Sequence, residues 1–247
     1  MAAPSEQVAA IDLGSLRQQI ERVLSAAPCV LVDGTVQDTG TVTVTGIAGR
    51  SAGDALRREV SDAAGSHALD WQVQRVDPVF CDVLSAIRPV TPLAGARDLG
   101  LRLALAGGRT ALHEDDYIQP RVTMPGFAGR LRVDYLAHDG SLQHLYPTVA
   151  QDRFVAVPGR TLRAGQMLEL GNPGGGRPQW QVAPPFGTDM IIAVASSVPL
   201  FDSPEPNEED NGSDYVRRLG HAIEAARSRG ASVSAAVMLV DTLPKSR

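Results

Sequence analysis

The sequence is poor in several features that mark large classes of protein. Aromatic residues make up only 4% of the 247 residues, so the core must be built mainly from Val, Leu, Ala and Ile. Basic residues never cluster beyond the pairs Arg57-Arg58 and Arg217-Arg218, and the net charge is -5. That charge argues against binding to a phosphate backbone, so we expect no nucleic-acid partner.

Long apolar runs are missing as well. The longest candidate, Met190 to Val198, has the length of a strand, far below the ~18 residues that a membrane-spanning helix needs. The first residues, Met-Ala-Ala-Pro-Ser-Glu-Gln, have neither the basic nor the apolar region of a signal peptide. We therefore expect no membrane span in this chain, and we expect it to be part of a longer polypeptide.

Cysteine is scarce, and the two that occur, Cys29 and Cys81, belong to no CxxC pair or Cys/His cluster. This excludes the usual zinc sites. Two alternatives remain. Either both are reduced thiols in the core, or they form a disulfide, whose loop would contribute roughly 4 kcal/mol in the chain-entropy model.

The first part of the chain alternates helical and extended patterns. A 43% apolar content is enough for a packed core. Spacing of apolar residues predicts, in order, a helix, a hairpin of two strands, a helix, a third strand and a short helix. Their ranges are 12–26, 29–36, 41–47, 54–64, 69–76 and 79–87.

The remainder is mostly strand-like and punctuated by Gly and Pro, which is typical of a β-sandwich or barrel. This second part is predicted to end with an acidic loop at 202–214, a helix at 215–229 and a strand at 232–240. The predicted strands are 101–106, 121–124, 129–137, 141–146, 152–157, 166–170, 179–182 and 190–196. The fold class is thus α+β: a small helix-covered three-stranded sheet, then a β-sandwich-like domain with one late helix. The predicted division is a tail at 1–10, a module at 11–90, a linker at 91–98 and a domain at 99–247.

Ser51 is the one candidate nucleophile. It lies in Gly49-Arg-Ser-Ala-Gly53, a Gly-x-Ser-x-Gly pattern between a predicted strand and a predicted helix. The alternative is a turn shaped by the two glycines, with Ser51 near the helix start as a cap. Because parallel βαβ alternation does not continue, we favour the structural role and expect no enzyme activity.

Metal and cofactor signals are weak. The cluster His113-Glu114-Asp115-Asp116 offers oxygen ligands suited to calcium, but neighbouring residues on a strand point to opposite sides. The Gly-rich runs 107–108 and 171–176 lack the Lys-Ser or Lys-Thr of a phosphate-binding loop. We therefore expect no metal and no cofactor. His144, expected on one strand face with Leu142 and Tyr146, is better explained as a packed, hydrogen-bonded histidine.

Two stretches carry resemblances to known families. The order of the first elements and Gly40-Thr-Val-Thr-Val-Thr-Gly46 resemble the small BON module of bacterial envelope proteins over about residues 12–78. Residues 99–200 resemble a bacterial all-β family of unknown function, found C-terminal to Ser/Thr protein kinases or caspase-like peptidases. The residues that carry the second resemblance are Asp139-Gly140, Leu145-Tyr146-Pro147 and Pro185-Phe186-Gly187-Thr188-Asp189.

These resemblances imply a non-catalytic sensor or protein-interaction module of the bacterial cell envelope, at the C-terminal end of a larger signalling protein such as a membrane Ser/Thr kinase. A periplasmic setting would favour the disulfide between Cys29 and Cys81. A small ligand or protein partner would meet the loops that carry Asn172, Arg177, Phe186, Thr188 and Asp189. The alternatives are a serine hydrolase that uses Ser51 and a scaffold subunit of a secretion or envelope assembly; a cytoplasmic location also stays open.

Overall fold

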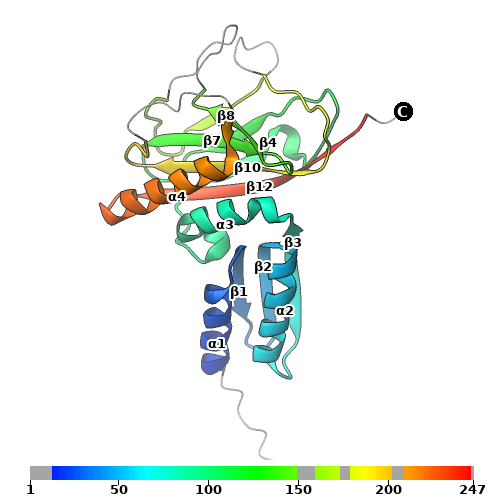
Figure 1. Ribbon diagram of the computed structural model, residues 1–247. Coiled ribbons are helices and arrows are strands. Elements are labelled where there is room, and N and C mark those ends of the chain that lie inside the picture. The colour runs from blue at the N-terminus through cyan, green and yellow to red at the C-terminus, as the bar shows by residue number, and fades with distance from the viewer. Residues whose placement is uncertain (1–12, 149–158, 173–178, 202–208, 246–247) are drawn as a thin grey trace, which may run out of the picture.

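The computed structural model describes residues 13–148, 159–172, 179–201 and 209–245 (Figure 1). The predicted strand at 152–157, most of the predicted acidic loop at 202–214, and Arg177 lie outside these ranges. Within them the chain forms helices α1 to α4 and strands β1 to β12, which are arranged in three sheets. No helix in the described part of the chain is both long enough and apolar enough to cross a membrane.

The first sheet has three strands in the order β1-β2-β3, antiparallel between the first two and parallel between the last two. Helices α1 and α2 cover one of its faces, and alternate strand residues such as Val32 and Val44 pack against Leu16 and Leu56 of the helices. The opposite face carries polar residues such as Thr43 and Thr45, and also Leu31 and Ile47, which belong to the hydrophobic cluster of the second part. The bounds are α1 Leu13–Ala26, β1 Val30–Val36, β2 Val42–Gly49, α2 Arg50–Ala64 and β3 Leu69–Val76.

Helix α2 begins four residues before the predicted start at residue 54, because the glycines around Ser51 do not form a turn. Gly53 lies inside the helix and is buried. A Cβ atom at this position would stand 3.1 Å from the Cβ of Ala48, so the glycine lets the helix approach strand β2 closely.

A six-stranded sheet in the order β11-β8-β7-β10-β12-β5 forms the centre of the second part, and a three-stranded sheet, β4-β6-β9, packs on one of its faces. Helices α3 and α4 cover the other face. The bounds are α3 Cys81–Ile87, β4 Arg102–Leu105, β5 Ala111–His113, β6 Pro120–Thr123, β7 Arg130–Leu136, β8 Ser141–Tyr146, β9 Met167–Glu169, β10 Thr188–Ser196, β11 Glu209–Asn211, α4 Gly212–Ser228 and β12 Val233–Leu243. The predicted α+β class, with a sandwich and a late helix, is confirmed.

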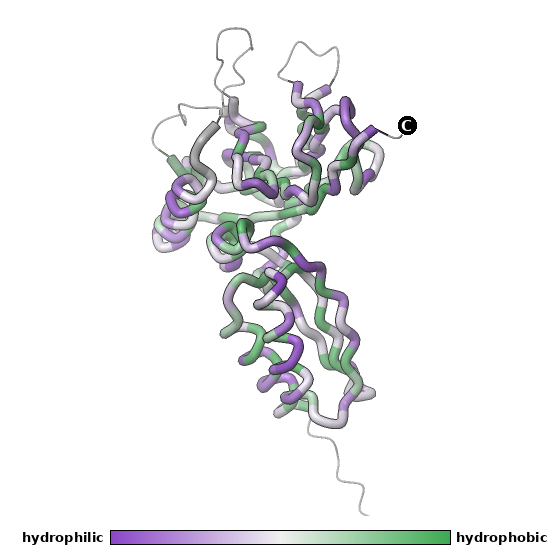
Figure 2. Tube along the Cα trace, turned by 45° about the vertical axis from the view of Figure 1, so that its right-hand side comes forward, coloured by the Kyte–Doolittle hydropathy of each residue, from purple (hydrophilic) through white to green (hydrophobic). Residues whose placement is uncertain are grey.

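Strand β10 explains the nearly continuous apolar run of the sequence. Met190, Ile192 and Val194 pack towards the helices, whereas Ile191 and Ala193 pack towards the small sheet. Figure 2 shows that the long strands crossing the middle of this part are mainly hydrophobic. A strand covered on both faces needs apolar residues at consecutive positions, so the alternation disappears.

Helix α3 joins the two parts of the molecule. Its Val83 and Leu84 belong to the same hydrophobic cluster as Leu31 and Ile47 of the first sheet and as Leu219 of α4. Short 3-10 turns at Arg88–Val90 and Pro92–Ala94 follow α3, and the buried Thr91 lies between them. The predicted linker at residues 91–98 stays a prediction, and one hydrophobic cluster contains residues from both sides of it.

A disulfide joins Cys29, just before β1, to Cys81, the first residue of α3. Of the two alternatives for the cysteines, the structure therefore has the oxidised one. Gly49 packs directly against this bridge, since a Cβ there would lie 2.5 Å from the sulfur of Cys29.

The predicted strand at 179–182 is wrong. Only Gln181 pairs, in an isolated bridge with Tyr117. Strand β5, which the sequence pattern missed, is three residues long and pairs in parallel with the distant β12. A segment this short has too few residues for alternation to be recognised.

Candidate functional site

Asp189, near the start of β10, is a buried carboxylate at the meeting point of three segments. Its side chain is surrounded by hydrogen-bond donors. Oδ1 accepts the backbone N–H of His138 at 2.9 Å and lies 2.7 Å from the Nδ1 of the same residue. Oδ2 accepts the hydroxyl of Tyr135 and, at 3.2 Å, that of Thr242 on β12. The carboxylate thus fastens the β7–β8 turn to β10 and β12.

The local sequence brings these groups together. Strand β7 pairs with β10 so that Tyr135 stands opposite Ile191, and the chain then turns through His138, Asp139 and Gly140 into β8. Asp139 closes that turn by accepting the backbone N–H of Ser141 at 2.9 Å and its hydroxyl at 2.7 Å. On the other side Gly187 touches the ring of His138, where a Cβ would come within 2.7 Å.

Two pKa shifts follow from this arrangement. The Ser141 hydroxyl, followed by the Ser141 backbone N–H, lowers the pKa of Asp139. Burial, followed by the hydrogen bond to the Asp189 carboxylate, raises the pKa of Tyr135 above its ordinary value. At neutral pH the Tyr135 phenol is therefore protonated and donates to Asp189.

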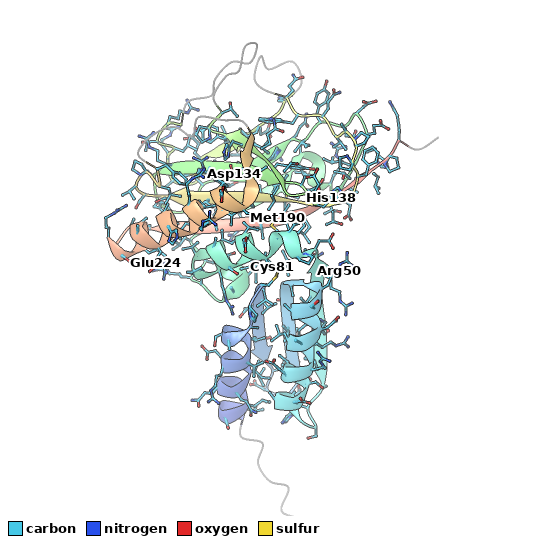
Figure 3. The ribbon with its side chains drawn as sticks, viewed as in Figure 1. Arg50, Cys81, Asp134, His138, Met190 and Glu224 are labelled. Atoms are coloured by element: carbon cyan, nitrogen blue, oxygen red, sulfur yellow. A yellow bond between two sulfur atoms is a disulfide. The ribbon has the colours of Figure 1, made fainter. Side chains whose placement is uncertain are left out.

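A cavity of about 360 Å³, here called the Asp189 cavity, lies beside this carboxylate. Amide and hydroxyl groups dominate its polar lining, and Trp180 and Val182 supply apolar surface. Figure 3 shows His138 at the end of the six-stranded sheet away from Glu224 of α4. The polar side chains that line the cavity are those of Tyr135, Asp139, Ser141, Gln143, Gln179, Gln181, Asp189 and Thr242.

A second buried polar cluster lies between the six-stranded sheet and α4. Oδ1 of Asp134 lies 2.6 Å from Nδ1 of His144, and the hydroxyl of Tyr215 donates to Oδ2. Nε of Arg132 donates to the same hydroxyl at 2.9 Å. Nε2 of His144 is buried without a hydrogen-bond partner among the described residues. Burial, with the Asp134 charge as the next cause, raises the pKa of Tyr215 well above its ordinary value.

Ser51 is exposed in the first turn of α2. The strand–helix–strand context of the Gly-x-Ser-x-Gly pattern is present, because β2 and β3 are parallel and α2 connects them. In the described part of the chain, however, no histidine or carboxylate is hydrogen-bonded to Ser51. The structure therefore does not bring an activating base to this hydroxyl.

Two of the three acidic residues after His113 form separate ion pairs. Asp115 lies 2.7 Å from Lys245, and Asp116 lies 3.1 Å from Arg109. Asp116 also accepts the backbone N–H of His113. Across the described residues no group of three or more His, Cys, Asp or Glu side chains could hold a metal ion, so Glu114, Asp115 and Asp116 are not gathered into one.

The loop residues predicted to contact a ligand have different environments. Asn172 is exposed, and its carbonyl accepts from Gln179 of the cavity at 3.4 Å. Phe186 packs against the core of the sandwich, and Thr188 donates to Asp241 at 2.7 Å. Only Asp189 lines the cavity, and Arg177 lies outside the described residues.

Sequence reasoning missed His138, Tyr135 and Thr242 as partners of Asp189. His138 and Asp189 are 51 residues apart, and Thr242 is 53 residues from Asp189. The only local signal was the turn Asp139-Gly140 beside His138, which indicates a hairpin but not what the hairpin touches.

Comparison with known families gives one match. Searches among curated proteins and among solved structures found no similar protein. Residues 112–199, less than half of the chain, match the family described as "Domain of unknown function (DUF4384)". This range holds Asp189, His138 and the rest of the polar cavity lining except Thr242. The chain thus contains a DUF4384 domain at residues 112–199.

Proposed function

We propose that this chain is a non-catalytic sensor or protein-interaction module of the bacterial cell envelope, in which the Asp189 cavity receives a small polar ligand. The observation that carries the proposal is the open cavity of about 360 Å³ inside the DUF4384 range, with its lining of amides and hydroxyls. Concave sites with a few convergent polar groups are the usual form of ligand sites.

The lining favours a neutral or cationic ligand rich in hydroxyl or amide groups. Gln143, Gln179 and Gln181 can each donate and accept hydrogen bonds. Asp139 adds a carboxylate, while the lining residues that the structure describes include no lysine or arginine. An anion would therefore meet repulsion, whereas a sugar or an amine would find partners.

Asp189 supports a binding role rather than a reactive one. Both of its oxygens accept hydrogen bonds from groups of the protein itself. A general base needs an oxygen that can approach the proton of a substrate. Because the oxygens of Asp189 are occupied by donors of the protein, this carboxylate is suited to fixing the wall of a binding site.

The cellular setting is part of the same proposal. The Cys29–Cys81 disulfide suits an oxidising compartment such as the periplasm. The resemblance of Pro185–Asp189 to a family found behind kinase or caspase-like domains supports a place in a larger signalling protein, such as a membrane Ser/Thr kinase.

Tryptophan fluorescence tests the ligand site. The chain has two tryptophans, so replacing Trp71 by Phe leaves Trp180 of the cavity as the only reporter. We expect diacetylchitobiose (neutral) or spermidine (cationic) to change its emission saturably. Replacing Gln181 by Ala should raise the dissociation constant about fivefold, which is the effect expected from the loss of one hydrogen bond to the ligand.

The matched control is Gln74→Ala, which removes an exposed glutamine of β3 far from the cavity. It should leave binding unchanged. An unchanged emission with both probes, or equal weakening by Gln74→Ala and Gln181→Ala, contradicts the ligand site. A stoichiometric protein complex found in that case would favour the scaffold alternative.

One observation favours a second candidate, a serine hydrolase. Ser51 stands at the start of the helix in a parallel β2–α2–β3 unit, the local context of a nucleophile elbow. Hydrolysis of p-nitrophenyl esters by the wild type and by Ser51→Ala tests it. Equal rates exclude Ser51 as the nucleophile.

A further inference from the structure

A second cavity, of about 300 Å³, lies at the other end of the β7–β10 pair from the Asp189 cavity; we call it the Arg132 cavity. It opens where β7 begins and β10 ends, since Arg132 stands opposite Val194 and Arg130 opposite Ser196. Its walls are formed by Arg130, Leu131, Arg132, Pro147, Gly159, Val194, Ser196, Pro199, Leu200 and Phe201.

The chemistry of these walls is unlike that of the Asp189 cavity. Carbon-rich side chains, among them Val194, Leu200 and Phe201, make most of the surface. Among the described residues that line it, the charged side chains are those of Arg130 and Arg132. A mainly apolar cavity lined by two guanidinium groups is complementary to an anion that carries an apolar body.

Arg132 is held in a fixed position. Only 7% of the residue is exposed. Its Nε donates to the Tyr215 hydroxyl at 2.9 Å, and its guanidinium carbon lies 4.9 Å from the centre of the Phe201 ring. A guanidinium oriented by such contacts loses little further freedom when a ligand binds, which favours affinity.

Arg130 supplies a second cation on the same sheet face, two residues before Arg132. It is half-buried, and one guanidinium nitrogen donates to the carbonyl of Gly159 at 2.9 Å. Two guanidinium groups on one side of a cavity form a setting in which a carboxylate can accept several charge-assisted hydrogen bonds.

We propose that the Arg132 cavity binds a small organic carboxylate with an apolar body, whose carboxylate meets Arg132 and Arg130 while the body packs against Val194, Leu200 and Phe201. This site is independent of the ligand site at Asp189, because the two share no lining residue. Each can therefore fail without the other.

Isothermal titration calorimetry of the full chain with octanoate tests the site. Octanoate should bind at a stoichiometry of one. Octanol, which has the same apolar body without the charge, should bind at least about tenfold more weakly, as a charge-assisted hydrogen bond is worth roughly 1.5 kcal/mol or more. Arg132→Gln should weaken octanoate binding to a similar degree and leave octanol binding nearly unchanged.

Because Arg132 is buried in a polar cluster, the more exposed Arg130→Gln serves as the second variant, and it should weaken octanoate binding several-fold. Arg121→Gln is the matched control, since Arg121 is an exposed arginine paired with Glu169 on the small sheet. Failure of octanoate to bind at millimolar concentration overturns the proposal. So does equal affinity for octanol, or an effect of Arg121→Gln as large as that of Arg130→Gln.

Discussion

At the scale of single residues, two buried aspartates organise the polar interior in the same way. Asp189 and Asp134 each accept one tyrosine hydroxyl and each lie within hydrogen-bond distance of one histidine Nδ1. The sequence could place both aspartates in or beside strands, but it could not pair them with their tyrosines and histidines. Tyr215, for example, reaches Asp134 across 81 residues, and only the packing of α4 on the sheet creates that contact.

Removing the charge of Asp189 should destabilise the fold. Asp189→Asn keeps the size of the side chain but replaces one acceptor oxygen by an NH₂ donor that faces donors. We expect the free energy of unfolding in urea to fall by about 2–4 kcal/mol, as for a broken buried charged pair. The control Asp241→Asn, at an exposed neighbour on β12, should stay within about 0.5 kcal/mol of wild type. A loss no larger than that of the control would contradict the role given to Asp189.

The raised pKa values of Tyr135 and Tyr215 predict a loss of stability at alkaline pH. An unfolded tyrosine ionises at pH about 10, whereas both side chains keep their protons in the folded state. The unfolded state then binds fewer protons, so the stability gained from these phenols is complete below pH about 10 and is lost as the pH rises through the folded-state values.

Urea unfolding at a series of alkaline pH values measures this effect. The double variant Tyr135→Phe/Tyr215→Phe should be less stable at neutral pH but should lose less stability above pH about 10 than the wild type. If the free energy of unfolding fell equally steeply with pH in both proteins, groups other than these two tyrosines would cause the pH dependence.

At the scale of elements, regular alternation of apolar and polar residues predicted strand bounds well, but it did not reveal irregular pairing between strands. Strands β3 and β8 have the predicted bounds. His144, however, does not share a face with both predicted neighbours, since Leu142 packs under the helices and Tyr146 packs in the sandwich. The register between β7 and β8 shifts between Val133 and Asp134, which turns Tyr146 to the opposite face. Such an irregularity depends on the partner strand, so no local pattern reveals it.

The contact between α3 and α4 depends on a small residue. A Cβ at Gly220 of α4 would lie 3.2 Å from the Cβ of Ala86 in α3. Gly220→Leu should therefore lower the free energy of unfolding by about 1–3 kcal/mol through overpacking. Ala225→Leu, which adds a leucine at an exposed position of the same helix, should change it by no more than about 0.5 kcal/mol. Thermal denaturation followed by circular dichroism compares the two, and equal stabilities would contradict close packing of these helices.

At the scale of the whole molecule, one core connects the two parts that the sequence suggested. Leu31, Ile47 and Val76 of the first sheet lie in the same cluster as Ile192 and Leu219 of the second part. The sequence predicted a linker at residues 91–98, where Pro92 and Gly95 interrupt the regular patterns. Composition does not report that the preceding helix α3 packs against both sides.

This shared core predicts that the chain unfolds in one transition. Each part holds one tryptophan: Trp71 packs in the first sheet and Trp180 in the sandwich. Urea unfolding of Trp180→Phe and of Trp71→Phe can each be followed by the fluorescence of the remaining tryptophan. The free energy of unfolding should depend on urea concentration with the same slope in both variants. In each variant, the midpoint of the fluorescence transition should equal the midpoint measured by circular dichroism. A fluorescence transition that separates from circular dichroism would mean that the parts unfold independently.

The disulfide also determines how the molecule would respond to a pulling force. Cys29 and Cys81 are 52 residues apart in sequence, and the chain between them contains β1, β2, α2 and β3. Tension that enters through α1 passes across the two sulfur atoms directly to α3. The enclosed segment, which would extend to roughly 180 Å if it were pulled out as a free chain, carries no load. While the bridge is oxidised, the disulfide itself is therefore a link of fixed length between α1 and α3, and the first sheet can be pulled out only after the bridge is reduced.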